Sequence, residues 1–210
     1  ASRVSGNPER LAANAGRSYI GSLLNGIGFV IEPGEAEKLK RENPRNAEVL
    51  FPYLTGQDLN SSPAHEASRW AINFFDWPIE KARQYPECLA IVEERVKPHR
   101  DALKNKPRVK EKWWRYEHEA QEMYAAIQPL GRVLVIAETS KVLQPAFVPK
   151  GMVYSHALVV FPYDDDGHFG VLSSGFHWWW ACTYASTLET RIRYTPTDCF
   201  ETFPQPQLTA

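Results

Sequence analysis

The apolar residues of this chain follow two different periods, and the change falls at Pro129-Leu130-Gly131. Before it, the apolar residues of 79–106 repeat every three to four positions, which indicates a helix interrupted at Pro98. After it, short β-type runs at residues 132–137, 146–148, 157–163 and 169–172 are separated by turn residues. We therefore predict an α+β fold, with a helix-rich N-terminal lobe followed by a mixed β-sheet lobe.

This change of pattern also suggests how the chain is divided. Its polar beginning and the turn before residue 131 mark the expected boundaries. The predicted segments are a linker or arm at 1–17, a helix-rich lobe at 18–130, a strand-rich lobe at 131–206 and a tail at 207–210.

Two local patterns give more detailed expectations. The turn dipeptide Asn25-Gly26 lies between apolar runs, so residues 18–32 are expected to form a β-hairpin. Residues 173–186 are expected to form a tryptophan-rich helix capped by Ser173 or Ser174. Its three adjacent tryptophans, at 178–180, are expected to fill the core between helix and sheet.

The composition excludes several classes of protein. The 210 residues carry a formal net charge of −1, so any positive surface must be local. Three widely separated cysteines favour neither a zinc site nor a disulfide framework. This cysteine pattern predicts a reducing cytoplasm as the location. No apolar run approaches the roughly 20 residues that span a bilayer, so we expect no membrane contact. The sequence begins without methionine, which we interpret as a piece of a longer protein.

Residues 97–115 hold the largest local excess of positive charge, with eight cations against Asp101 and Glu111. The cations are Lys97, Arg100, Lys104, Lys106, Arg108, Lys110, Lys112 and Arg115. One interpretation is a solvated helix face followed by a lysine-rich loop. The other is a patch that contacts DNA phosphates, which adds affinity and salt dependence but carries no sequence information.

Residues 186–194 place charged side chains at alternate positions of a predicted strand. Because a strand alternates its side chains, Glu189, Arg191 and Arg193 are expected to point the same way. Glutamate accepts a hydrogen bond from the cytosine amine, and arginine donates two bonds to guanine. The row therefore either reads base pairs or forms a surface ladder of salt bridges.

The remaining polar clusters are weaker signals. Asp164-Asp165-Asp166 precedes a glycine between two predicted strands, which is more typical of a turn than of a metal site. The six histidines lack metal-ligand spacing, and no catalytic triad can be identified from spacing. We predict neither a catalytic residue nor a metal ligand in this chain.

Five segments occur in an order that resembles one known family. They are FPYLTGQDLN at 51–60, RWAINF at 69–74, GRVLV at 131–135, HFGVLSS at 168–174, and RYTP through FPQP at 193–206. Together they are similar to the C-terminal target-recognition region of MmeI-like (type IIL/IIG) restriction–modification proteins. Those are single chains that combine a nuclease, an adenine-N6 methyltransferase and a DNA-reading domain. The resemblance spans about residues 18–206, and the family's nuclease and S-adenosylmethionine motifs are absent from this sequence.

The resemblance implies positions that read bases. The family's main readers lie on the strand that follows the helix after HFGVLSS, and two further positions lie near earlier strands. The matching residues here are Glu189, Thr190, Arg191 and Arg193, then His156 and Ala157, then Ser140 and Lys141.

The resemblance also implies a function, that of a specificity module for double-stranded DNA that positions a target adenine for methylation. Its partners would be DNA and the catalytic methyltransferase domain of the same parent chain, which would bind S-adenosylmethionine; this chain would hold no cofactor. The parent would be an adenine-specific DNA methyltransferase, with or without endonuclease activity. One alternative is a protein-interaction module that docks on a catalytic domain without touching bases. Another is a small-molecule enzyme that uses the acidic turn and the histidines.

Overall fold

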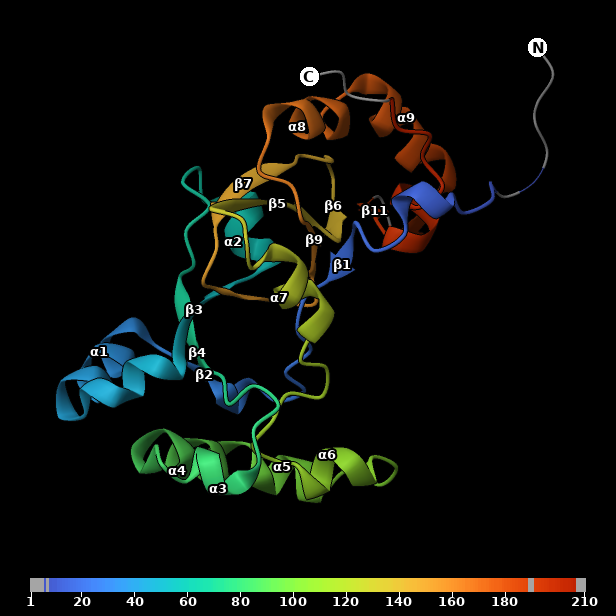
Figure 1. Ribbon diagram of the computed structural model, residues 1–210. Coiled ribbons are helices and arrows are strands. Elements are labelled where there is room, and N and C mark those ends of the chain that lie inside the picture. Colours follow the sequence, from blue (N-terminus) through green and yellow to red (C-terminus); the bar gives the residue numbers. More distant parts are fainter. Residues whose placement is uncertain (1–5, 7, 189–190, 207–210) are drawn as a thin grey trace, which may run out of the picture.

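The computed structural model describes residue 6, residues 8–188 and residues 191–206. Its described part forms three β-sheets with helices around them (Figure 1). Helix makes up 41% and strand 20%, so the predicted α+β class is confirmed.

The α-helices fall mainly in the first two thirds of the chain, and the strands occur throughout. The helices are α1 (Pro33–Glu42), α2 (Gly56–Ser61), α3 (Ile79–Ala82), α4 (Pro86–Arg95), α5 (Lys97–Asp101), α6 (Pro107–Glu111), α7 (Gln121–Ile127), α8 (Asp166–Leu172) and α9 (Gly175–Tyr184). The strands are β1 (Tyr19–Ile20), β2 (Val30–Ile31), β3 (Leu50–Leu54), β4 (Arg69–Ile72), β5 (Arg132–Ala137), β6 (Thr139–Ser140), β7 (Ala146–Pro149), β8 (Val153–Tyr154), β9 (Leu158–Phe161), β10 (Ser186–Leu188) and β11 (Arg191–Arg193). Short helical turns cover Ala12–Asn14, Ile27–Phe29, Pro44–Glu48 and Pro196–Phe200.

The central sheet has the strand order β1-β9-β5-β7 and is covered on both faces. Val133 and Val135 of β5 pack with Met123 of α7, whereas Leu134 and Ile136 pack with the core under α8 and α9. In Figure 1, α8 and α9 lie on one side of this sheet and α7 lies on the other. Because both faces are buried, β5 reads as a continuous apolar run instead of an alternating one.

The second sheet has the order β2-β4-β3-β8 and packs against α1 and α4. Leu39 of α1 and Val92 of α4 belong to the same apolar cluster as Ile31 and Ala71 of this sheet. The helix predicted over 79–106 is divided into α3, α4 and α5. α4 ends at Arg95 and α5 begins at Lys97, with Pro98 in its first turn. The predicted interruption is confirmed.

Strand pairing crosses the predicted lobe boundary at residue 131. β3 pairs in parallel with β8, and β1 pairs with β9 in antiparallel. Two of the three sheets in the described chain therefore take strands from both sides of that residue, and the division into 1–17, 18–130, 131–206 and 207–210 stays a prediction.

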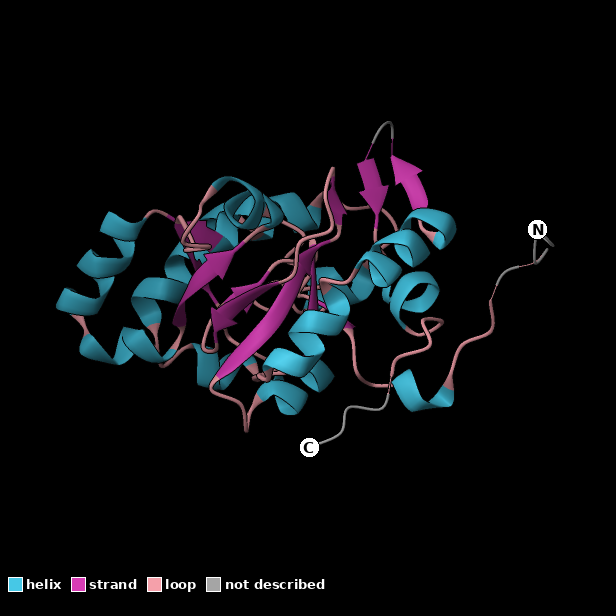
Figure 2. Ribbon diagram, turned by 90° about the horizontal axis from the view of Figure 1, so that it is seen from above, coloured by secondary structure: helices cyan, strands magenta, loops and turns pink. Residues whose placement is uncertain are grey.

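The third sheet has the order β10-β11-β6, and we call it the small sheet. β10 and β11 run antiparallel with Leu188 opposite Arg191, and β6 pairs with the other side of β11. In Figure 2, β10 and β11 stand at the edge of the molecule.

Two strand predictions are wrong, one of a hairpin and one of a single strand. Residues 18–32 do not form a hairpin, because β1 pairs with β9 and the chain turns through Asn25 and Gly26 into a short helical turn. Residues 169–172 belong to helix α8, whose first turn is capped when the His168 N–H donates to Asp165 Oδ1 at 2.9 Å. A four-residue apolar run does not distinguish strand from helix, and here the cap decides.

The tryptophans of α9 do not fill the core as expected. Trp178 is 38% exposed, Trp179 is 62% exposed and nearby Phe176 is 83% exposed. Three consecutive helical residues spread over more than half a turn, and His177 and Ala181 take the buried face. The cap at Ser174 is as predicted, since its hydroxyl accepts from the His177 N–H.

Among the described helices, none is both long and apolar enough to cross a bilayer.

Candidate nucleic-acid interface

The small sheet brings together two segments that lie about 50 residues apart in the sequence. Ile192 lies opposite Ser140 and Arg193 lies opposite Thr139. Residues 186–193 thus contribute two strands, β10 and β11, instead of the single strand expected. Glu189 and Thr190 lie outside the described residues. Arg191 is half-buried in β11.

Arg193 carries the most exposed described side chain of β11. It is 55% exposed, and its Nε donates to Oε1 of Glu138 at 3.1 Å. The Glu138 side chain is only 16% exposed. The carboxylate is thus enclosed by the fold, while the guanidinium reaches solvent.

His156 and Ala157 lie beside the same residue. The Glu138 N–H donates to the Ala157 carbonyl at 2.8 Å, and the His156 side chain is exposed. The backbone crosses this segment closely at Gly21, where an added Cβ would overlap the Ser155 carbonyl oxygen. Only glycine permits that approach, so Gly21 helps to fix the segment in place.

Ser140 and Lys141 differ in what they can reach. Ser140 is 9% exposed and its hydroxyl donates to Oδ1 of Asn60 on α2 at 3.2 Å. Lys141 is exposed. Ser140 is therefore placed to hold the loop, a correction to its expected base contact, and Lys141 is the residue of this pair that a partner can reach.

A buried pair anchors the end of β11. His177 Nδ1 donates to the Leu172 carbonyl at 2.8 Å, and its Nε2 lies 3.0 Å from the Tyr194 hydroxyl. Burial lowers the pKa of His177 to about 4, so the ring is neutral and Nε2 accepts from Tyr194. The Tyr194 N–H also donates to the Glu138 carbonyl at 2.7 Å. The residue after Arg193 is therefore fixed by both its backbone and its side chain.

A cavity of about 620 Å³ connects the small sheet with the basic segment. Glu138, Arg193 and Thr195 line one part of it, and Arg108 and His118 line another. One cation predicted to contact phosphate, Arg108, and one residue predicted to read bases, Arg193, thus line the same cavity.

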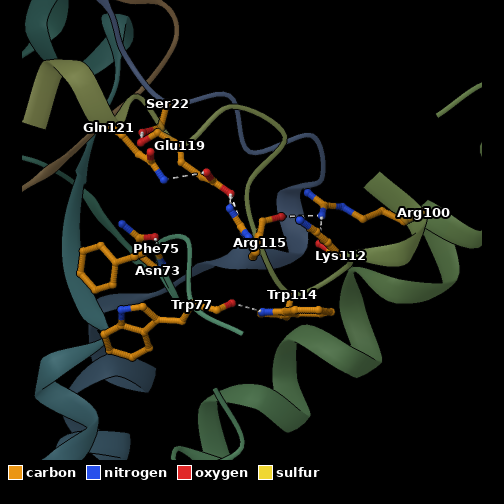
Figure 3. A network of polar contacts seen from close by, with 10 residues as sticks. All are labelled: Ser22, Asn73, Phe75, Trp77, Arg100, Lys112, Trp114, Arg115, Glu119 and Gln121. Atoms are coloured by element: carbon orange, nitrogen blue, oxygen red, sulfur yellow. Dashed lines mark hydrogen bonds and ion pairs between the residues drawn. The ribbon is translucent and has the colours of Figure 1, made fainter. Parts of the chain in front are cut away.

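Arg100 does not belong to that surface. It is fully buried, and its Nη2 donates to the Leu24 carbonyl at 2.6 Å. Its Nη1 donates to the carbonyls of Lys112, Trp113 and Arg115. Figure 3 shows the side chain of Arg100 turned toward Lys112 and Arg115. Desolvation lowers its pKa to about 10, and it stays charged at neutral pH. The predicted phosphate contact of Arg100 is therefore corrected: it ties two loops together.

Three other cations of the segment are engaged in ion pairs. Lys97 contacts Glu93 at 2.7 Å, and Lys106 contacts Glu117 at 2.6 Å. Arg115 contacts Glu119 at 2.6 Å, with side-chain exposures of 11% and 12% (Figure 3). Within the described part of the chain, the cations of this segment that are neither buried nor in an ion pair are Lys104, Arg108, Lys110 and Lys112.

The acidic turn has structural partners. Asp165 caps α8 and contacts His168 Nδ1 at 2.7 Å, while Asp166 pairs with Arg132 at 2.9 Å. Within the described chain, no group of three or more histidine, cysteine, aspartate or glutamate side chains is arranged to hold a metal ion.

A second, apolar cavity lies away from the small sheet. Its volume is about 810 Å³, and its walls include Phe176, Trp179 and Trp180 of α9 together with Phe203 and Pro204. It shares no lining residue with the cavity beside the small sheet. We call this cavity the apolar groove.

Sequence reasoning missed Glu138 and the apolar groove. Glu138 follows directly on the buried run of β5, and a charge at the end of an apolar strand was the available signal. The tryptophans that line the groove were misleading in the sequence, because large aromatic side chains usually pack in the core.

The comparisons with known proteins agree with this fold. A family model described as the MmeI target recognition domain matches residues 12–207. A solved structure of the type IIL restriction–modification enzyme MmeI in complex with DNA is similar, with a TM-score of 0.74 and 21% sequence identity. The match covers 99% of this chain and 26% of that one, so the chain spans about a quarter of that enzyme's length. A search of curated proteins finds no match.

Proposed function

Because this chain belongs to the MmeI target-recognition-domain family, we propose that it reads a base sequence in double-stranded DNA for a larger restriction–modification enzyme. One observation carries the proposal: three segments far apart in the sequence, which resemble the family's base-reading positions, meet around Glu138. They are residues 139–141, 156–157 and 191–193.

The mechanism follows from the dimensions of DNA. The major groove is about 12 Å wide and admits a two-stranded ribbon, so β10 and β11 have a suitable form. The charged side chains of β11, Arg191 and Arg193, would contact base edges, while Lys104, Arg108, Lys110 and Lys112 would contact phosphates.

A catalytic domain elsewhere in the parent chain would bind S-adenosylmethionine and methylate an adenine flipped out of the duplex. In this proposal the residues of this chain position the DNA, and the chemical step belongs to the catalytic domain. A cytoplasmic location stays a prediction.

Binding-site selection from a random duplex library tests the proposal directly. The full-length protein that carries this chain is expected to enrich one sequence motif. Retention of DNA without enrichment would contradict base reading. Absence of salt-dependent DNA binding would instead favour the interaction module that touches no bases.

Replacing four cations is expected to flatten the salt dependence of DNA binding. The variant carries alanine at Lys104, Arg108, Lys110 and Lys112. Each lost phosphate contact reduces the slope of log K against log salt by about 0.9, so four contacts reduce it by roughly 3.6. Fluorescence anisotropy on a labelled duplex at several salt concentrations measures the slope.

The matched control removes four exposed cations elsewhere, at Lys38, Arg41, Lys81 and Lys150. Its slope should equal that of the wild type. Equal slopes for the two variants would show that the basic segment has no special role in contacting phosphate.

We further propose that the apolar groove receives the catalytic part of the parent chain. Phe176 and Trp179 are 83% and 62% exposed, and large exposed apolar patches mark interaction sites. The related enzyme has about three quarters of its length outside the matched region. A covalently attached domain is present at high effective concentration and needs no separate binding partner.

Phe176→Ser is expected to destabilise the full-length protein but not the 210-residue chain alone. The phenyl ring is exposed in the chain and would be buried only against another domain, where losing it costs about 2 kcal/mol. Thermal unfolding of both forms gives the comparison. Ile27→Ser, at a site that is 75% exposed, is the control and should leave both unchanged. An equal effect of Phe176→Ser on both forms would contradict the docking.

A further inference from the structure

Glu138 lies where the three candidate reading segments meet. Its N–H donates to the Ala157 carbonyl at 2.8 Å, and its carbonyl accepts from the Tyr194 N–H at 2.7 Å. Its side chain accepts from Nε of Arg193 at 3.1 Å. Backbone and side chain together thus connect this residue to both neighbouring segments.

The placement of the two charges is asymmetric. The Glu138 side chain is 16% exposed, whereas that of Arg193 is 55% exposed. A pair with so exposed an arginine contributes little to folding stability, because water screens it and the long side chain loses rotamer freedom. A contribution to folding stability therefore does not explain why Glu138 and Arg193 form an ion pair.

Orientation of the Arg193 guanidinium explains the ion pair better. Reading guanine requires two parallel N–H donors held in one plane, and an arginine on an exposed strand has many rotamers. A guanidinium has five N–H donors, and the bond to Glu138 occupies one of them. The same side chain can therefore be held by the carboxylate and still donate to a base edge.

The residues on both sides of this ion pair are held firmly. The backbone N–H and carbonyl of Glu138 both form hydrogen bonds, and Tyr194, the residue after Arg193, is held by buried His177. Both ends of the Glu138–Arg193 contact are therefore attached to rigid parts of the fold, as a selective site requires.

We propose that Glu138 is a positioning residue for base recognition, which orients the Arg193 guanidinium toward one base pair of the DNA site. This inference rests on the proposed function, and it assigns a role to a residue outside the family-like reading positions.

The test compares Glu138→Ala, Glu138→Gln, Arg193→Ala and the double alanine variant in the full-length protein. The motif is first selected from random duplexes with the wild type. Affinity is then measured for the motif and for duplexes with each base pair replaced in turn. Glu138→Ala is expected to lose about tenfold or more of the discrimination at one position, with the others unchanged.

The other variants separate positioning from a structural role. Glu138→Gln keeps an oxygen that accepts from Nε and should retain part of the discrimination. Arg193→Ala should affect the same position, and the double variant should lose no more than Arg193→Ala alone. The melting temperature of Glu138→Ala should match that of Glu94→Ala, an exposed glutamate on α4.

The two possible failures are distinguishable. A wild type without a motif would reject the proposed function itself. A selective wild type whose Glu138→Ala variant keeps full discrimination, or loses it equally at every position together with a lower melting temperature, would reject only the role of Glu138.

Discussion

Exchanging Glu189 for lysine and Arg191 for aspartate is expected to change one base pair of the recognised DNA site. Glutamate accepts from the cytosine amine and arginine donates to guanine, so an acid and a guanidinium group two residues apart in the sequence suit a single C·G pair. Reversing the charges would favour the opposite orientation. Each good pairing discriminates by about 1–3 kcal/mol, which amounts to roughly five- to 150-fold in binding.

Methylome sequencing of cells that express the full-length protein measures this result, because the modified adenines reveal the motif. A single altered position is the expected outcome. The variant Lys38→Glu/Arg41→Asp, on helix α1, is the control and should leave the motif as it was. An unchanged motif with full activity in the Glu189/Arg191 variant would rule out base reading by this pair.

Replacing Arg100 by methionine is expected to destabilise the fold strongly. The guanidinium bonds the carbonyls of Leu24, Lys112, Trp113 and Arg115, and methionine would leave these acceptors without their donor. Removing one partner of such a buried network costs about 3–5 kcal/mol. For a chain of this size that corresponds to a fall in melting temperature of roughly 10 °C.

Thermal unfolding followed by circular dichroism measures the change. Lys104→Met, at an exposed position of the same segment, is the matched control and should melt like the wild type. Arg100→Lys should recover only part of the stability, since an ammonium has three donors and no planar fork. If Arg100→Met folds with unchanged stability and only weakens DNA binding, Arg100 is a phosphate contact after all.

Local signals predicted much of the secondary structure. The helix break at Pro98 and the cap at Ser174 depend on the residue itself and its near neighbours, so a sequence pattern suffices. The continuous apolar run of residues 132–137 likewise indicated a strand. Short ambiguous runs failed, as at residues 169–172, where the cap from Asp165 produces a helix.

The candidate site was predicted less completely, because its members are held by distant contacts. The eight cations of residues 97–115 look alike in sequence. Arg100 is nevertheless buried, and its guanidinium donates to carbonyls of two separate loops. Glu138 gave no strong signal, since its importance depends on lying beside Arg193 and Ala157.

The sequence by itself determined the α+β class, most of the strand and helix positions, and the resemblance to a target-recognition domain. These depend on periodicity, capping and the order of short motifs, which are local properties of the chain. Only the tertiary structure decided which cations face outward, that Trp178 and Trp179 of α9 are exposed, and that residues 138–141, 156–157 and 191–193 meet. Those outcomes depend on strand pairing and burial between residues far apart in the sequence, which no local period specifies.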